Sequence, residues 1–256
     1  MKSWREVEEI RETVEMMTGF PGTWCIAGGW AIDLFLGEVT RPHRDVDLAI
    51  YRKDQWAIRE HFRGWRIQKV VGGQLVDWPP AEWLDPPVHE IHVTLGDGGI
   101  EEVGTDQDAP EQGGPVPGST ERGSTEVGGP APGSTERGGT EVGRTGQRST
   151  EQGGHAKGFV RSLEFLLNDG LDGMWIFRRN PRVMRPLERV MQAGTDGVPI
   201  LAPAIVLLYK AKAPRAHDQH DFDLVRERLE PDERRWLRSA LEIVHPGHEW
   251  IRKLEA

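Results

Sequence analysis

A long stretch of Gly, Ser, Thr, Pro and Glu interrupts this 256-residue chain near its middle and limits where a folded core can form. Residues 101–158 contain no Leu, Ile, Met, Phe, Trp or Tyr, and GPVPGSTERGSTEVG (114–128) is followed at once by its near-copy GPAPGSTERGGTEVG (129–143). Such a segment buries too little apolar surface to offset the entropy of ordering about 57 residues. We therefore predict a disordered insert, with an interaction tail as the alternative.

The segments on either side of the insert both have the pattern of strands. VHEIHVTL (88–95) alternates apolar and polar residues, and SLEFLLND (162–169) follows the insert. The insert is then an enlarged hairpin turn, which costs little because loop-closure entropy grows only logarithmically with length. We predict an α+β fold with a small mixed β-sheet domain from residues 1–100 and 159–198. The insert (101–158) splits this domain, and a C-terminal helical domain (199–256) follows it.

The remaining elements are predicted from capping residues and periodicity. A capping box of Ser3 and Glu6 opens a first helix, and Pro203 opens the first helix of the C-terminal region. Further helices are expected over 30–36, 54–62, 221–229 and 231–244, and strands over 24–27, 45–51 and 65–71.

Composition excludes several classes of protein. Cys25 is the single cysteine, so a disulfide framework is excluded, and the charged N-terminus has no apolar region typical of a signal peptide. No apolar run approaches the roughly 18 residues needed to span a membrane. We therefore expect a soluble, cytoplasmic protein. The net charge of −9 lies partly in residues 101–157, which hold ten acidic and five basic residues, and the rest shows no basic footprint for nucleic acid.

Residues 28–50, GGWAIDLFLGEVTRPHRDVDLAI, contain the strongest chemical signal. Gly28 and Gly29 lie between a predicted strand and a predicted helix, where backbone N–H groups and the helix N-terminus favour an anion. Asp45 and Asp47 alternate along a predicted strand, so both carboxylates lie on one face, about 7 Å apart. Two like charges there need a cation between them, and Mg²⁺ prefers oxygen ligands and accepts substrate phosphates. A solvated strand face is the alternative for an isolated D-x-D.

This pattern resembles the polymerase-β-type nucleotidyltransferase superfamily, and GGWAID followed by TRPHRDVD is similar to its aminoglycoside and lincosamide adenylyltransferases. The resemblance is strong over residues 22–51 and weaker to about residue 250. It implies that AMP passes from ATP to a hydroxyl of a small acceptor, such as an aminoglycoside-like antibiotic, with release of pyrophosphate. It also implies two Mg²⁺ ions on Asp45, Asp47 and a third carboxylate, with Gly28 and Gly29 on the nucleotide phosphates.

Two residues compete to be the third carboxylate, Glu90 in the strand before the insert and Glu164 in the strand after it. By the resemblance this acid sits on the last strand of the excursion after the D-x-D strand, so we favour Glu164 and keep Glu90 as the alternative. Arg41 and His43, between the Gly pair and the aspartates, and Lys210 and Lys212 are expected to bind the nucleotide. The alternative for the lysines is ordinary solubilising side chains at a helix C-terminus.

Three further features leave the function open. Ala204 stands where related sequences often have an acidic residue. The arginines of RRNPRVMR (178–185) either contact phosphate or lie on a solvated loop, and no spacing among the histidines matches a zinc site.

Two other functions remain as alternatives to transfer to a small molecule. The acceptor is a protein or tRNA, as in toxin–antitoxin nucleotidyltransferases, or the protein is a catalytically retired nucleotide-binding module.

Overall fold

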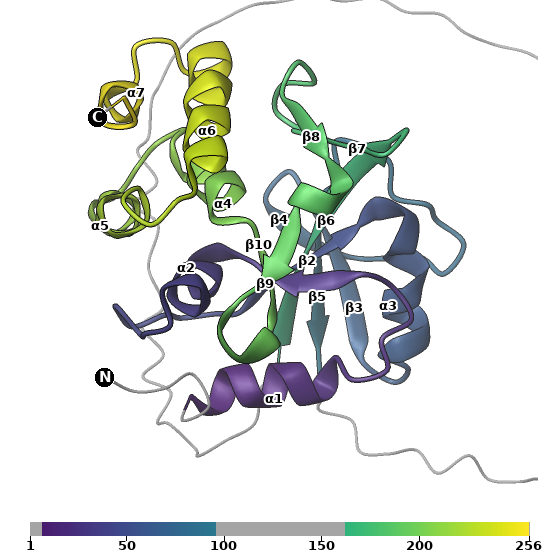
Figure 1. Ribbon diagram of the computed structural model, residues 1–256. Helices are drawn as coiled ribbons and strands as arrows, with labels where there is room; N and C mark the ends of the chain where they lie inside the picture. Colours follow the sequence, from purple (N-terminus) through teal and green to yellow (C-terminus); the bar gives the residue numbers. More distant parts are fainter. Residues whose placement is uncertain (1–6, 96–161, 256) are drawn as a thin grey trace, which may run out of the picture. The chain divides into compact units, whose positions relative to one another are not determined.

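Residues 7–95 and 162–255 are described by the computed structural model, and within them the strands form one mixed sheet (Figure 1). Its main path runs β4-β3-β5-β6-β2-β1-β10-β9, with β7 and β8 paired off β6. The strands are β1 (Trp24–Ile26), β2 (Asp47–Tyr51), β3 (Arg66–Val71), β4 (Gln74–Asp77), β5 (Glu90–Thr94), β6 (Ser162–Leu171), β7 (Met174–Ile176), β8 (Met184–Pro186), β9 (Met191–Ala193) and β10 (Pro199–Leu201).

The centre of this sheet places the chemistry-bearing strands next to each other. β2 and β6 are parallel, and the register pairs Asp47 with Glu164. β5 and β6, the strands that flank the insert, are antiparallel, from Thr94 opposite Ser162 to Glu90 opposite Leu166. The prediction that two in-register strands flank the insert is therefore confirmed. The insert itself, with its predicted disorder, lies outside the described residues, as does the capping box of Ser3 and Glu6.

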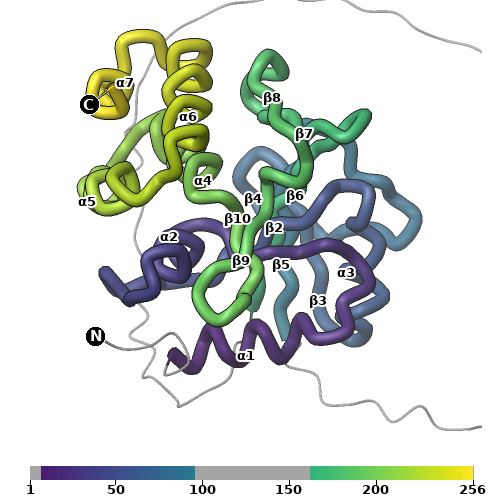
Figure 2. The backbone as a smooth tube through the Cα atoms, viewed as in Figure 1, coloured from purple at the N-terminus to yellow at the C-terminus, as the bar shows by residue number. Residues whose placement is uncertain are grey.

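The helices pack around the sheet and on each other (Figures 1 and 2). They are α1 (Glu8–Met16), α2 (Gly28–Leu36), α3 (Gln55–His61), α4 (Pro203–Lys210), α5 (Ala216–Val225), α6 (Pro231–Val244) and α7 (Glu249–Lys253), with short 3₁₀ turns at Arg52–Asp54, Leu187–Arg189 and Thr195–Gly197. α2 is buried on most of its surface and contacts α4, α5 and β10, which is why its sequence is apolar almost throughout. It ends at Gly37, whose φ of +79° is favoured by glycine.

The α+β class and its mixed sheet are confirmed, and several element boundaries differ from the prediction. β2 begins at Asp47, so Asp45 precedes the strand. α5 begins at Ala216, five residues before the predicted start, because Asp218 caps its first turn by accepting a hydrogen bond from the backbone N–H of Arg215. β4, β7, β8, β9 and β10 were not predicted, because strands of three or four residues carry little periodic signal.

Residues 7–95 and 162–255 together form one compact unit. β10 lies within the predicted helical region yet pairs with β1 and β9 in the sheet. The division into a sheet domain and a helical domain from residue 199 stays a prediction. Within the described part of the chain, no helix is long and apolar enough to cross a membrane.

Candidate active site

The Gly pair at the start of α2 lies against the D-x-D segment. The backbone N–H of Ala27 donates to the carbonyl of Asp47 (2.8 Å), which ties the end of β1 to the start of β2. Gly28 has a φ of +58°, and a Cβ atom there would collide with the carboxylate of Asp47. A Cβ atom at Gly29 would collide with the side chains of Arg41 and His43. Glycine suits Gly28 for its positive φ as well as for the close side chain, whereas at Gly29 any larger residue would have to displace Arg41 and His43.

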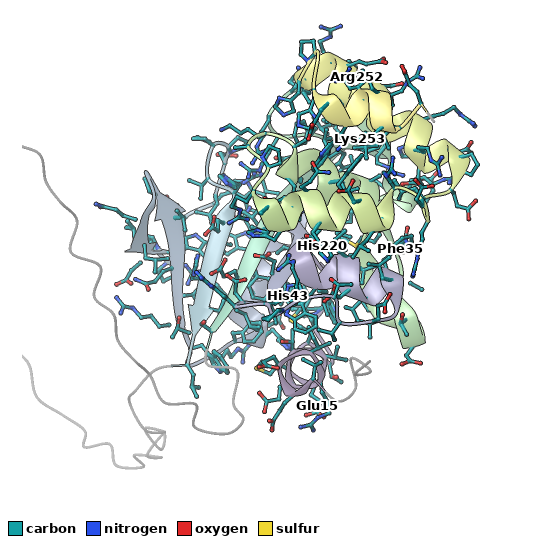
Figure 3. The ribbon with its side chains drawn as sticks, turned by 90° about the vertical axis from the view of Figure 1, so that its left-hand side faces the viewer. Glu15, Phe35, His43, His220, Arg252 and Lys253 are labelled. Carbon is teal, nitrogen blue, oxygen red and sulfur yellow. The ribbon has the colours of Figure 1, made fainter. Side chains whose placement is uncertain are left out.

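Asp33 anchors the loop between α2 and β2. Its buried carboxylate accepts hydrogen bonds from the hydroxyl of Thr40 (2.5 Å) and the backbone N–H of Thr40 (3.1 Å). It also lies 2.7 Å from Nε2 of His43, whose ring packs on Trp30 with centroids 4.3 Å apart. Figure 3 shows His43 beside α2, and its side chain is almost fully buried. The structure therefore fixes His43 with its Nδ1 toward Gly29, at the edge of the predicted phosphate position.

Four carboxylates gather at the start of β2. The pKa of Asp47 is raised to about 6, first by burial and then by the negative charges of Asp45, Glu164 and Glu90, while Lys210 acts against this shift. The pKa of Glu164 is raised as well, first by burial, while His92 acts against the shift. The neighbouring negative charges that contribute to the raised pKa of Asp47 and Glu164 are unfavourable together unless a cation joins them, so the site fits a divalent metal held by oxygen ligands.

Both candidates for the third carboxylate lie close to Asp47. Glu164 is its register partner on the neighbouring strand β6, and Glu90 is one strand further away on β5. His92 lies between the two glutamates, with Nε2 2.7 Å from Oε1 of Glu90 and Nδ1 3.8 Å from Oε1 of Glu164. The direct strand pairing with Asp47 favours Glu164.

Arg41 and Lys210 meet in a buried charge network with two aspartates of α5. Arg41 donates from Nε and Nη2 to the two carboxylate oxygens of Asp221, each at 3.0 Å. Nζ of Lys210 lies 2.6 Å from Asp218 and 3.1 Å from Asp221. Both aspartates are almost fully buried. The network joins the loop before β2 to α4 and α5, and it shows that Lys210 is not a solubilising surface lysine.

Asp218 gives this network a pH dependence. Burial raises the pKa of its carboxyl, but hydrogen bonds from Lys210 and Arg215 outweigh that effect and lower the pKa to about 2. Because this lies below the ordinary value near 3.9, ionised Asp218 stabilises the fold above about pH 4, and that contribution is lost as the pH falls towards 2.

We expect Asp218→Asn to lower the free energy of unfolding by about 2 kcal/mol near neutral pH, with the deficit shrinking as the pH falls from 4 towards 2. Urea unfolding of both proteins across pH 2.5–6 measures this. Asp223→Asn changes an exposed aspartate of the same helix and is the matched control. A deficit that stays constant across the pH range would contradict the assignment.

A cavity of about 1070 Å³ opens at this site and brings most of the predicted residues together. The predicted residues that line it are Gly28, Gly29, Arg41, His43, Asp45, Asp47, Lys210 and Lys212. Lys212 is exposed on its wall, whereas Glu164 and Glu90 do not line it. Ala204 is fully buried on α4 and does not line it either.

Sequence reasoning missed the residues that hold this cavity in shape. Asp221 and Asp218 form ion pairs with Arg41 and Lys210, the two side chains predicted to bind the nucleotide. Tyr209 and Asn168 line the wall of the cavity. The spacing of Asp218 and Asp221, three residues apart on one helix, was the available signal, because such a pair presents both carboxylates on one side.

Comparison with known proteins supports the resemblance over the N-terminal part of the chain. Residues 9–83 match the family model of aminoglycoside-2''-adenylyltransferase. A 2''-aminoglycoside nucleotidyltransferase of Escherichia coli is 40% identical over a stretch covering 23% of this chain and 40% of the relative. One of Klebsiella pneumoniae is 37% identical with the same coverage. The match thus spans less than half the length of these curated relatives.

Two solved structures are also similar. The crystal structure of ANT(2'')-Ia in complex with adenylyl-2''-tobramycin shares 14% identity and covers 93% of this chain and 98% of its own, with a TM-score of 0.46. That of the lincosamide antibiotic adenylyltransferase LnuA, lincomycin-bound, shares 13% identity and covers 85% and 94%, with a TM-score of 0.43. The match to the family model confirms the resemblance indicated by the Gly pair and the D-x-D segment: over residues 9–83, this chain is similar to the aminoglycoside-2''-adenylyltransferase family.

Proposed function

We propose that this protein is a nucleotidyltransferase that transfers AMP from ATP to a hydroxyl of a small acceptor, such as an aminoglycoside-like antibiotic, and releases pyrophosphate. The observation that carries the proposal is the contact of Gly28, at the N-terminus of α2, with Asp47, the register partner of Glu164. This contact brings a phosphate-binding backbone next to a set of metal-binding carboxylates. With ATP as donor, we also propose the cytoplasm as the place of the reaction.

The carboxylates Asp45, Asp47 and Glu164 would hold two Mg²⁺ ions. Bound there, the metal would neutralise phosphate charge and lower the pKa of the acceptor hydroxyl. Burial and then repulsion from the neighbouring carboxylates raise the pKa of Asp47, and this repulsion supports the assignment because a cation would relieve it.

The chain's own groups would position the nucleotide around this centre. The first backbone N–H groups of α2 are free of helical partners and would donate to phosphate oxygens. Arg41 and His43 lie against Gly29, and Asp221 and Asp33 fix their orientation. Lys210, held by Asp218, would present its positive charge to the same cavity. Glu164, the register partner of Asp47, would either help to hold the second metal ion or accept the proton of the acceptor hydroxyl directly, as that oxygen attacks the α-phosphorus and pyrophosphate leaves.

The residues that would hold the donor lie within the part of the chain that matches the family model. The matched residues 9–83 include Gly28, Gly29, Asp45 and Asp47, which would hold the nucleotide and the metal. They include neither β6 nor α4, which complete the cavity. The proposed acceptor class comes from the names of the relatives, which are 2''-aminoglycoside nucleotidyltransferases.

An acceptor screen tests the proposed function. The protein is mixed with ATP or GTP, Mg²⁺ and a panel of aminoglycosides and lincosamides, and both pyrophosphate and nucleotidylated product are measured. We expect pyrophosphate and product in equal amounts with ATP and at least one antibiotic. An adduct of AMP on protein or tRNA, with no product across the panel, would instead favour a macromolecular acceptor.

Glu164 and Glu90 are expected to differ in their effect on turnover. Glu164→Gln should lower kcat by about a hundredfold, because it removes the charge directly beside Asp47. Glu90→Gln should cost less than about tenfold, because Glu90 lies one strand further away and already contacts His92. Steady-state kinetics of both variants measures this, and the reverse order of effects would assign the third carboxylate to Glu90.

A further inference from the structure

The four arginines of RRNPRVMR occupy three different environments. Arg185 is buried, and its Nη1 lies 3.2 Å from Glu233 while its guanidinium stacks 4.4 Å from the ring centre of Trp236. Arg182 is exposed and does not line the cavity. Arg178 and Arg179 are exposed as well, but both line the cavity that Asp45 and Asp47 also line. Arg185 is therefore structural and Arg182 is solvated, whereas Arg178 and Arg179 face the substrate space.

Tyr209 of α4 holds Arg178 and Arg179 next to each other. Its ring centre lies 5.3 Å from the guanidinium carbon of Arg178 and 5.1 Å from that of Arg179. Nη1 of Arg179 also donates to the backbone carbonyl of Tyr209 (2.8 Å). Burial lowers the pKa of Arg179, and the neighbouring charge of Arg178 lowers it further. Two adjacent positive charges are thus held together on one ring, an arrangement that an anion would relieve.

Three of the cations that line the cavity have carboxylate partners. Arg41, Lys210 and Arg215 are all paired with the aspartates of α5. By contrast, within residues 7–95 and 162–255 no carboxylate forms an ion pair with Arg178 or Arg179. Arg178 and Arg179 therefore place two positive charges without a carboxylate partner on the wall of the cavity that would hold a substrate.

We propose that Arg178 and Arg179 form an oxyanion subsite of the cavity, which binds a phosphate or similar oxyanion of a substrate. Guanidinium groups suit this role because they donate paired hydrogen bonds to phosphate and carboxylate oxygens. The subsite rests on the proposed function, because its ligand would be a substrate of the nucleotidyl transfer reaction. The oxyanion is either the phosphate chain of the donor or an anionic group of the acceptor. In both cases this end of the cavity disfavours the ammonium groups of a polycationic acceptor.

The first experiment titrates pyrophosphate with Mg²⁺ into the full-length protein and into Arg178→Gln/Arg179→Gln by calorimetry. If the subsite holds the donor's phosphates, the double variant should bind pyrophosphate and ATP at least about tenfold more weakly. Arg178→Lys/Arg179→Lys keeps both charges and should recover part of the affinity. Arg182→Gln removes an exposed arginine from the same loop and should bind like the unchanged protein.

The second experiment titrates inorganic phosphate into protein already saturated with a non-hydrolysable ATP analogue and Mg²⁺. Phosphate binding that the double variant loses, with pyrophosphate affinity unchanged, would assign the subsite to an anionic group of the acceptor. Unchanged binding in both experiments would overturn the subsite, even if transfer to an antibiotic is found. Weakened pyrophosphate binding without any transfer would support the subsite and count against the proposed function.

Discussion

Replacing Asp47 by asparagine is expected to lower the rate of nucleotidyl transfer by about a thousandfold or more. The carboxylate of Asp47 lies between Gly28 on one side and Glu164 on the neighbouring strand. It is the member of the acidic cluster whose pKa is raised to about 6, by burial and by three neighbouring carboxylates. Asparagine keeps the size of the side chain and removes the charge that would hold the metal. The loss should therefore appear in turnover, with the melting temperature kept or raised.

Pyrophosphate release at saturating ATP and Mg²⁺ measures this effect. Asp77→Asn is the matched control, because Asp77 is 75% exposed on the edge strand β4 and lies outside the cavity. The control should keep its activity within about twofold. An Asp47→Asn protein that retains a tenth of the original rate would show that Asp47 does not bind an essential metal. A second readout is thermal stabilisation by Mg²⁺, which the unchanged protein should show and the variant should lose.

Gly28→Ala is expected to abolish most of the transfer activity, with a loss of about a hundredfold or more. Two effects act at this position. A side chain at a φ of +58° is strained by about 1–2 kcal/mol, and its Cβ atom would collide with the carboxylate of Asp47. The collision has to move either Asp47 or the start of α2, so the metal-binding and phosphate-binding groups lose their relative positions.

Gly72→Ala separates these two effects. Gly72 has the same φ of +58°, but a Cβ atom there meets nothing within 4 Å. Both variants should lose a similar amount of stability from backbone strain, while only Gly28→Ala should lose activity. Urea unfolding and pyrophosphate release, measured on both variants, give the comparison. Equal activities in the two variants would contradict the close approach of Gly28 to Asp47.

The part of the site that the sequence predicted is local in the chain. Gly28, Gly29, Asp45 and Asp47 lie within twenty residues, and their spacing alone places a turn, a helix start and a carboxylate pair. The hairpin of β5 and β6 was also predictable, because both strands alternate clearly and flank the insert.

The part that the sequence did not predict depends on contacts between distant residues. Arg41 and Asp221 are 180 residues apart, and nothing near either one indicates the other. The different roles of Arg179 and Arg185 could not be separated either, since both belong to one basic run and only the packing of Tyr209 and Glu233 distinguishes them. The short strands β7 to β10 acquire their structure from pairing in the sheet, which periodicity does not encode.

The most direct test of the proposed transfer follows the α-phosphate of ATP. The protein is incubated with Mg²⁺, an antibiotic panel and ATP labelled at that phosphate, with and without EDTA. The proposal predicts that the label moves to an antibiotic, that pyrophosphate appears in equal amount, and that EDTA abolishes both. Tight binding of ATP and Mg²⁺ with the label remaining in ATP across the whole panel and in the presence of protein and tRNA acceptors would contradict it, and would identify a nucleotide-binding module instead.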